Sequence, residues 1–130
     1  MMKWFPVFLM MLLLAGCGAG GENAPGYRQI TMEEAVAMMA EESDYVLLDV
    51  RTPEEFTQAH ITGALNIANE TIGTEEIPQL PDKTQRILVY CRSGNRSKQA
   101  SEKLAKLGYT NVVEFGGIND WPGETVSGAE

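Results

Sequence analysis

Short apolar runs that alternate with helix-patterned segments constrain the fold of this 130-residue chain more than any other feature. Residues 45–50 and 86–90 are the two clearest runs, and neither has the polar alternation of a half-exposed strand. Such runs are typical of strands buried on both faces of a parallel sheet. Because the length allows one hydrophobic core, we expect a single α/β domain with a largely parallel sheet.

The remaining segments continue this alternation. Thr31 and Glu34 have the spacing of a capping box, and Pro53 suits the first turn of a helix. The pattern predicts helices over 32–42, from Pro53 onward, and from Arg96 or Ser97 to Leu107, with a weaker helix over 70–80. It also predicts strands over 64–67 and 111–115, and a turn at Gly116-Gly117.

The amino-terminal segment has the layout of a signal peptide. Lys3 precedes a charge-free run over 4–15, which is shorter than the roughly 20 residues that a membrane-spanning helix needs. The run ends in Leu-Ala-Gly-Cys at 14–17, which resembles the lipobox of bacterial lipoproteins. An ordinary secretory peptide with an incidental thiol, and an uncleaved anchor helix, are the alternatives.

The lipobox resemblance implies a lipoprotein signal peptide at 1–16, with Cys17 lipidated after cleavage. Residues 17–26 would then form a Gly-rich tether. We therefore expect a domain anchored by lipid on the extracytoplasmic face of a membrane, in a bacterial cell envelope. Gly18 is not the aspartate that marks inner-membrane retention, so the resemblance favours the outer membrane where there are two.

Charge is distributed unevenly along the chain. The formal net charge is −8, which argues against nucleic acid as a partner. Seven of the ten basic residues nevertheless lie between 83 and 106, where Glu102 is the only acid. A basic patch of this kind attracts small anions. Lys98, Lys103 and Lys106 fit the solvated face of a helix, but Arg92 and Arg96 flank a cysteine.

That cysteine, Cys91, is expected to be a nucleophile. It follows the best predicted strand and precedes the best predicted helix, at the sheet edge where ligands bind in parallel sheets. Gly94 allows a tight loop, and the N–H groups and helix dipole there favour a thiolate. The chain has only two cysteines, so lipidation of Cys17 would leave Cys91 unpaired.

Four motifs, in this order, resemble the rhodanese family of sulfurtransferases. They are LLDVRTPEEF at 47–56, HITGALNI at 60–67, CRSGNRS at 91–97 and GGINDW at 116–121. The resemblance implies a rhodanese-like domain over 27–123, followed by a tail at 124–130. It also implies a mainly parallel sheet of about five strands with helices on both faces. Ala59 stands where the family usually has a glycine.

The family implies a persulfide mechanism without a cofactor or metal. Cys91 would take sulfur from a small anionic donor such as thiosulfate and pass it to a thiol, cyanide or a protein acceptor. Arg96 would bind the donor or pair with a carboxylate, and Asp49 and Arg51 would brace the loop from a neighbouring strand. The residues expected to bind the anionic sulfur are Arg92, Ser93, Gly94, Asn95 and Arg96, with Arg92 on the donor's anionic end.

Several alternative functions remain open from the sequence. Phosphatases and arsenate reductases with a similar loop place an arginine one position later than Arg96, where this chain has Ser97. A non-catalytic rhodanese-like binding module would not need Cys91. A sulfur carrier with a protein acceptor cannot be separated from a small-molecule transferase by sequence. Nothing in the sequence demands a partner subunit, so we expect a monomer.

Overall fold

The structure is a computed structural model that describes residues 26–129. The expected signal peptide, Cys17 and all of the expected tether except Gly26 lie outside the described residues. In chain order, the strands (β), α-helices (α) and 3-10 helices (η) are β1 (Arg28–Gln29), α1 (Met32–Glu41), β2 (Val46–Asp49), α2 (Pro53–Gln58), β3 (His60–Ile61), β4 (Leu65–Asn66), η1 (Asn69–Thr71), β5 (Ile87–Cys91), α3 (Asn95–Lys106), β6 (Val112–Gly117), η2 (Ile118–Asp120) and β7 (Thr125–Val126).

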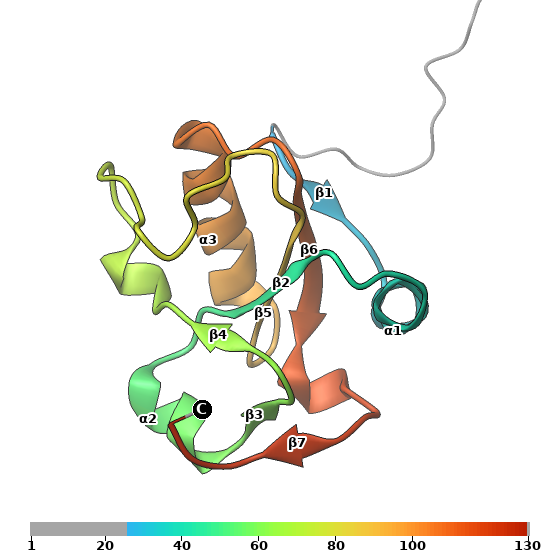
Figure 1. The fold of residues 1–130 in the computed structure, drawn as a ribbon. Helices are drawn as coiled ribbons and strands as arrows, with labels where there is room; N and C mark the ends of the chain where they lie inside the picture. Colours follow the sequence, from blue (N-terminus) through green and yellow to red (C-terminus); the bar gives the residue numbers. More distant parts are fainter. Residues whose placement is uncertain (1–25, 130) are drawn as a thin grey trace, which may run out of the picture.

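Five strands form a parallel sheet in the order β1-β6-β5-β2-β4 (Figure 1). β5 lies at the centre, and all five of its residues are buried. Its neighbour β2 is buried over three of four residues. The α/β class, the mainly parallel sheet of about five strands and the two buried central strands are confirmed.

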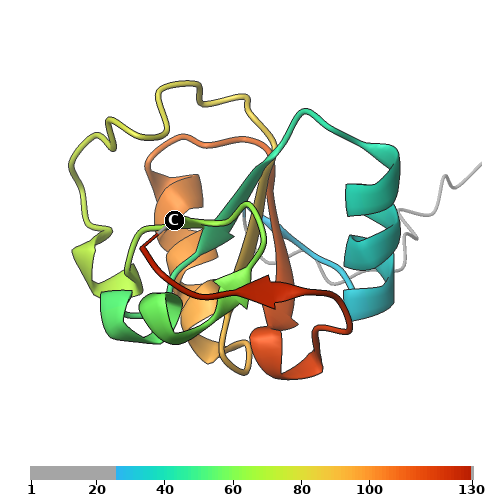
Figure 2. The ribbon, with the colours of Figure 1, turned by 60° about the horizontal axis from the view of Figure 1, so that its bottom comes forward.

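Helices cover both faces of this sheet, as expected (Figure 2). α3 and α1 lie on opposite sides of the strands, and each encloses its own hydrophobic cluster. Because side chains alternate along a strand, Val89 and Cys91 of β5 face the α3 cluster, whereas Leu88 and Tyr90 face the α1 cluster. The cysteine therefore points toward α3.

Local hydrogen bonds begin the first two helices where the sequence predicts them. Thr31 accepts the Glu34 N–H and the Glu34 carboxylate accepts the Thr31 N–H, which completes a capping box. Thr52 and Glu55 form a second box, with Pro53 at the first helical turn. Such caps stabilise a helix by about 1 kcal/mol each.

The third helix spans the height of the sheet. α3 begins at Asn95, after Gly94 in a left-handed conformation (φ 108°), and ends before Gly108 (φ 100°). A Cβ at Gly26 would lie 2.6 Å from the Cβ of Ala105, so the start of the described chain packs against the last turns of α3. The opposite end of α3 adjoins Cys91.

Two predictions about local structure are wrong. The weak helix over 70–80 is replaced by η1 and turns, because Gly73 and Pro78 interrupt a helix and the segment instead buries Ile72 and Ile77 in the α3 cluster. Residues 116–117 end β6 rather than forming a turn: the pairing with β5 shifts register there, and Gly116 has φ 102°.

The sequence did not predict β1, β3 or β7, each of two residues. β7 lies in the expected tail and pairs antiparallel with β3, with His60 opposite Val126. The Gly128 N–H also donates to the Thr57 carbonyl at 2.8 Å. These contacts fasten the carboxyl-terminal segment to α2 and β3 (Figure 2).

Candidate active site

Cys91 lies at the carboxyl end of the central strand, beneath the loop that leads into α3. Its side chain is 1% exposed, and it is the free cysteine of the described residues. The Gly94 N–H donates to Sγ at 3.0 Å. Gly94 has a left-handed conformation, which turns the chain from the loop into α3. The N–H contact and the start of α3 together stabilise negative charge on sulfur.

A buried serine contacts the sulfur, and a buried glutamate contacts that serine. Ser97 Oγ lies 3.4 Å from Cys91 Sγ and donates a hydrogen bond of 2.6 Å to Glu114 Oε2. The Gly116 N–H donates to the same carboxylate oxygen at 2.8 Å. Ser97 is fully buried and Glu114 is 3% exposed. The thiol is thus connected to a carboxylate through one hydroxyl group.

Arg96 forms a bidentate ion pair with a carboxylate of α2. Its two Nη atoms lie 2.6 Å and 3.0 Å from the two carboxylate oxygens of Glu55. This hydrogen bonding, with a further contribution from Thr52, lowers the pKa of Glu55 to about 2 although partial burial acts in the opposite direction. Arg96 was expected either to bind the donor or to pair with a carboxylate. In the structure it pairs with the Glu55 carboxylate, and this ion pair connects α3 to α2.

Asp49 and Arg51 pair with each other. Arg51 Nη2 lies 2.7 Å from Asp49 Oδ2 and donates to the Ala59 carbonyl at 2.6 Å. The guanidinium also lies 5.8 Å from the centre of the Tyr90 ring, which faces the α1 cluster. Burial, followed by the charge of Asp49, raises the pKa of Tyr90. Outside the pair, the Arg51 side chain reaches the Ala59 carbonyl after α2, and Asn66 of β4 donates to the carbonyls of both residues. Among the described contacts, no side-chain hydrogen bond joins the pair to residues 91–97.

The outer residues of the loop are open to solvent. Arg92, Ser93 and Asn95 are exposed. Arg92 lines a cavity of about 190 Å³, together with Arg51 and Asn119, and its carbonyl accepts the Asn119 N–H at 3.2 Å. Within residues 26–129 Arg92 makes no salt bridge, so its charge is available to an anion at the mouth of the loop.

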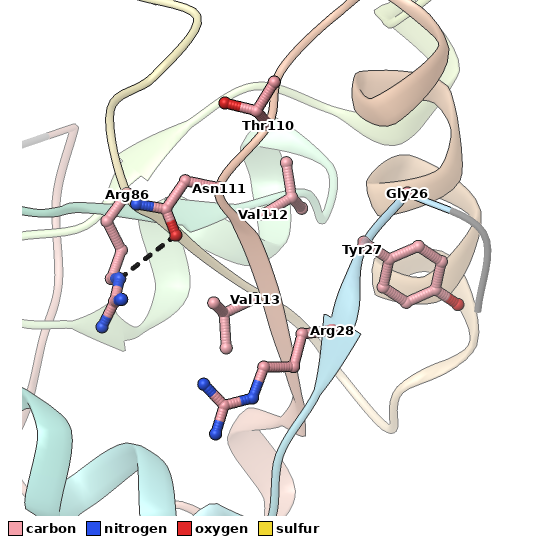
Figure 3. Close-up of a pocket in the computed structure, with 8 residues that line it drawn as sticks. All are labelled: Gly26, Tyr27, Arg28, Arg86, Thr110, Asn111, Val112 and Val113. Atoms are coloured by element: carbon pink, nitrogen blue, oxygen red, sulfur yellow. Dashed lines mark hydrogen bonds between the residues drawn. The ribbon is translucent and has the colours of Figure 1, made fainter. Parts of the chain in front are cut away.

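A second pocket lies at the opposite edge of the sheet. It has a volume of about 370 Å³ and adjoins the starts of β1 and β6 (Figure 3). Arg28 lies on its β1 side, and Arg86 bonds Asn111 at 3.3 Å on its other side. None of the candidate residues around Cys91 lines this pocket.

The described residues hold no cluster of three or more His, Cys, Asp or Glu side chains able to bind a metal ion. Across residues 26–129, no helix has both the length and the apolar character to cross a membrane. His60, the single histidine, is buried in β3 and contacts the Phe56 carbonyl through Nδ1 at 2.8 Å.

The place of Glu114 in this site was not predicted from the sequence. The sequence placed Glu114 only in a strand, and it placed Ser97 at a helix start and in the loop motif. A usable signal was present, because Glu114 is the one acid in the apolar run 112–115 and a glycine pair follows it. A charged residue in a buried strand requires a partner.

Several known proteins are similar to this chain. Thiosulfate sulfurtransferase PspE of Escherichia coli (strain K12) is 41% identical over 73 residues, which cover 56% of this chain and 70% of that protein. Thiosulfate sulfurtransferase GlpE of Pseudomonas entomophila (strain L48) is 34% identical over 107 residues, which cover 78% and 94%. A solved structure described as a rhodanese with anions from E. coli superposes with a TM-score of 0.59 at 40% identity, over 65% of this chain and 99% of that one.

The family profile of the Rhodanese-like domain matches residues 31–124. This match covers the whole sheet except β1 and includes Cys91, its loop and Glu114. The chain belongs to the rhodanese-like domain family.

Proposed function

We propose that this chain is a sulfurtransferase that carries sulfane sulfur on Cys91. The observation that carries the proposal is the 3.0 Å contact of the Gly94 N–H with Sγ at the start of α3. This arrangement favours the thiolate, which is the nucleophilic form of cysteine. Two relatives named thiosulfate sulfurtransferase support the same chemistry.

Sulfur transfer takes two displacement steps. The Cys91 thiolate attacks the outer sulfur of thiosulfate, a new S–S bond forms as the donor's S–S bond breaks, and sulfite leaves with the bonding electron pair. A thiol, cyanide or a protein acceptor then attacks the outer sulfur of the persulfide and restores the thiolate. The N–H groups of residues 92–96 stabilise the anionic sulfur, as an oxyanion hole stabilises oxygen. Neither step requires a cofactor.

Arg92 is the residue we assign to the donor's anionic end. It is exposed, lies next to Cys91 and lines the 190 Å³ cavity at the mouth of the loop. Arg96 is already paired with Glu55, so its main effect is to hold α3 against α2. We assign Asp49 and Arg51 to support of the α2–β3 connection that forms one wall of this cavity.

The alternative functions fit the same residues less well. A phosphatase or arsenate reductase would need an arginine at position 97, where a fully buried serine bonds Glu114. A non-catalytic binding module would have no use for a thiol that accepts a backbone N–H beneath a basic loop. A protein acceptor remains within the proposal, since it changes the second step only.

Intact mass spectrometry of the full chain tests the proposal. Incubation with thiosulfate should add the mass of one sulfur atom, and later addition of cyanide should remove it. The gain should be absent in Cys91→Ser and present in Cys17→Ala, which removes the other cysteine as a matched control. A gain that persists in Cys91→Ser, or no gain in the parent chain, would refute the proposal.

We further propose that Cys17 carries the lipid and that the domain works as a monomer at the extracytoplasmic face of a bacterial membrane. The lipobox-like residues 14–17 support this. In a bacterial host, the parent chain should fractionate with membranes and Cys17→Ala should not. Equal membrane association of both would require an uncleaved anchor instead. Sedimentation of the detergent-free domain after proteolytic release should give the mass of one chain.

A further inference from the structure

The cluster formed by Cys91, Ser97 and Glu114 suggests a route for the proton that the cysteine must lose. The alternation of side chains along β5 and β6 places Cys91 and Glu114 on the same face of the sheet. Ser97 of α3 lies between them. All three side chains are at least nine-tenths buried. A buried carboxylate is costly unless hydrogen bonds or a shared proton compensate it.

Ser97 has a single hydroxyl hydrogen and three acceptors within reach. Glu114 Oε2 lies at 2.6 Å, the Gly94 carbonyl at 3.0 Å and the Gly116 carbonyl at 3.3 Å. The carboxylate is the strongest and nearest acceptor, so the hydrogen points to Glu114. The Ser97 oxygen then turns a lone pair to Cys91, whose S–H donates to it across 3.4 Å.

We propose that Glu114 accepts, through Ser97, the proton that Cys91 loses. The S–H proton moves to the Ser97 oxygen while the Ser97 hydrogen moves to Glu114 Oε2. The products are a thiolate and a neutral carboxyl group, and the summed charge of the three side chains is unchanged. The hydroxyl hydrogen now faces the thiolate, and the Gly94 N–H provides a second donor.

A shared proton follows from the placement of these two groups. A thiolate and a carboxylate that meet through one buried hydroxyl repel each other, so the pair favours a state with one negative charge. Carboxylate pairs that share one proton are the familiar case of this behaviour. The inference rests on the proposed nucleophilic role of Cys91. Glu114 is a positioning residue, because it acts through Ser97.

Three other ionisable groups lie around the cluster: Arg92, Arg96 and Tyr27. Arg92 adjoins Cys91 in the loop. Hydrogen bonding to Glu55, and the nearby Cys91, raise the pKa of Arg96 on α3. Burial, and then the charge of Glu114, raise the pKa of Tyr27, which precedes β1. The charged side chains of α1 belong to the opposite face of the sheet.

The pH profile of Cys91 alkylation tests this relay. Iodoacetamide reacts with the thiolate, so its rate reports the thiolate fraction. The full chain carrying Cys17→Ala, in detergent, leaves Cys91 as the only cysteine, and intact mass gives the rate. A coupled pair should give two steps separated by a plateau. Glu114→Gln should give one step, with a rate that falls about tenfold per pH unit below its midpoint.

Two further variants isolate the relay. Ser97→Ala leaves the Glu114 charge in place but removes the hydroxyl that hydrogen-bonds both groups, so the alkylation rate on the plateau should change, and an unchanged plateau rate would exclude Ser97 from the relay. Glu102→Gln removes the same formal charge from an exposed position on α3 and should keep both steps. Thermal melting identifies any variant that fails to fold, and the plateau rate of Ser97→Ala tests the relay where Glu114→Gln does not fold.

A one-step profile in the parent chain would overturn the relay, and so would two steps that persist in Glu114→Gln. The measurement uses no sulfur donor, so its result is independent of the thiosulfate experiment. Loss of the plateau together with a normal one-sulfur mass gain would refute the relay alone. A two-step profile without any mass gain would refute the proposed transfer alone.

Discussion

The close contact between β6 and the reactive loop makes Gly117→Ala the most informative substitution for the fold of this site. Gly117 has an extended backbone (φ −140°) that any residue can adopt, so backbone strain is not at issue. A Cβ there would overlap the carbonyl of Arg92 and lie 2.6 Å from the Ser93 nitrogen. Both are backbone atoms and cannot rotate away, so the loop itself must move.

The size of the effect follows from that overlap. A contact at ordinary van der Waals distance requires a displacement of about 1.5 Å, and overpacking of this kind costs about 1 to 3 kcal/mol. Each kcal/mol lowers the Tm of a domain of this size by about 4 to 8 °C. A misplacement of about 1 Å at a reacting group can reduce the rate about a hundredfold. We expect persulfide formation to slow by about that factor.

Gly73→Ala is the matched control, because a Cβ at Gly73 meets nothing within 4 Å and the residue is exposed. Differential scanning calorimetry gives the two Tm values, and the time course of the one-sulfur mass gain gives the two rates. If Gly117→Ala behaves like Gly73→Ala in both measurements, the close backbone approach described here does not hold the loop.

Two smaller predictions concern the groups that surround the loop. Because the pKa of Glu55 is lowered to about 2 from its ordinary 4.5, its contribution to stability is complete above about pH 4.5 and is lost as the pH falls toward 2. The Tm should therefore drop more steeply over this range in the parent chain than in Glu55→Gln, and equal slopes would contradict the assigned ion pair. Tyr90→Phe removes the acceptor of the Ile61 N–H (3.1 Å) and should cost about 1 to 3 kcal/mol in urea unfolding. Tyr45→Phe, whose hydroxyl makes no hydrogen bond within residues 26–129, should change the free energy of unfolding by less than about 0.5 kcal/mol.

The parts of the fold that the sequence predicted are those with local signals. The Thr31 capping box depends on residues three apart, the start of α2 depends on Pro53, and the central strands depend on continuous apolar runs. The position of Cys91 at the carboxyl edge of the sheet followed from a strand, a loop and a helix in succession. Short-range patterns were enough for each of these.

The parts that were missed depend on residues distant in sequence. β3 and β7 have two residues each, too few for a periodic pattern, and they pair across more than 60 positions. The Ser97–Glu114 bond joins residues 17 apart on different elements. The Arg51–Ala59 bond spans only eight positions, but it needs α2 between them to bring the Ala59 carbonyl back to Arg51.

Gly26 and Cys91 lie at opposite ends of α3, which we call the two poles of the domain. Gly26 packs against Ala105, whereas Cys91 adjoins the first turn of α3, and the ten residue steps from Asn95 to Ala105 separate them by about 15 Å along the helix axis. A chain held through Cys17 would therefore be attached at one pole and reactive at the other. The attachment point and the reactive loop would then use different ends of α3, so tethering would not cover the sulfur.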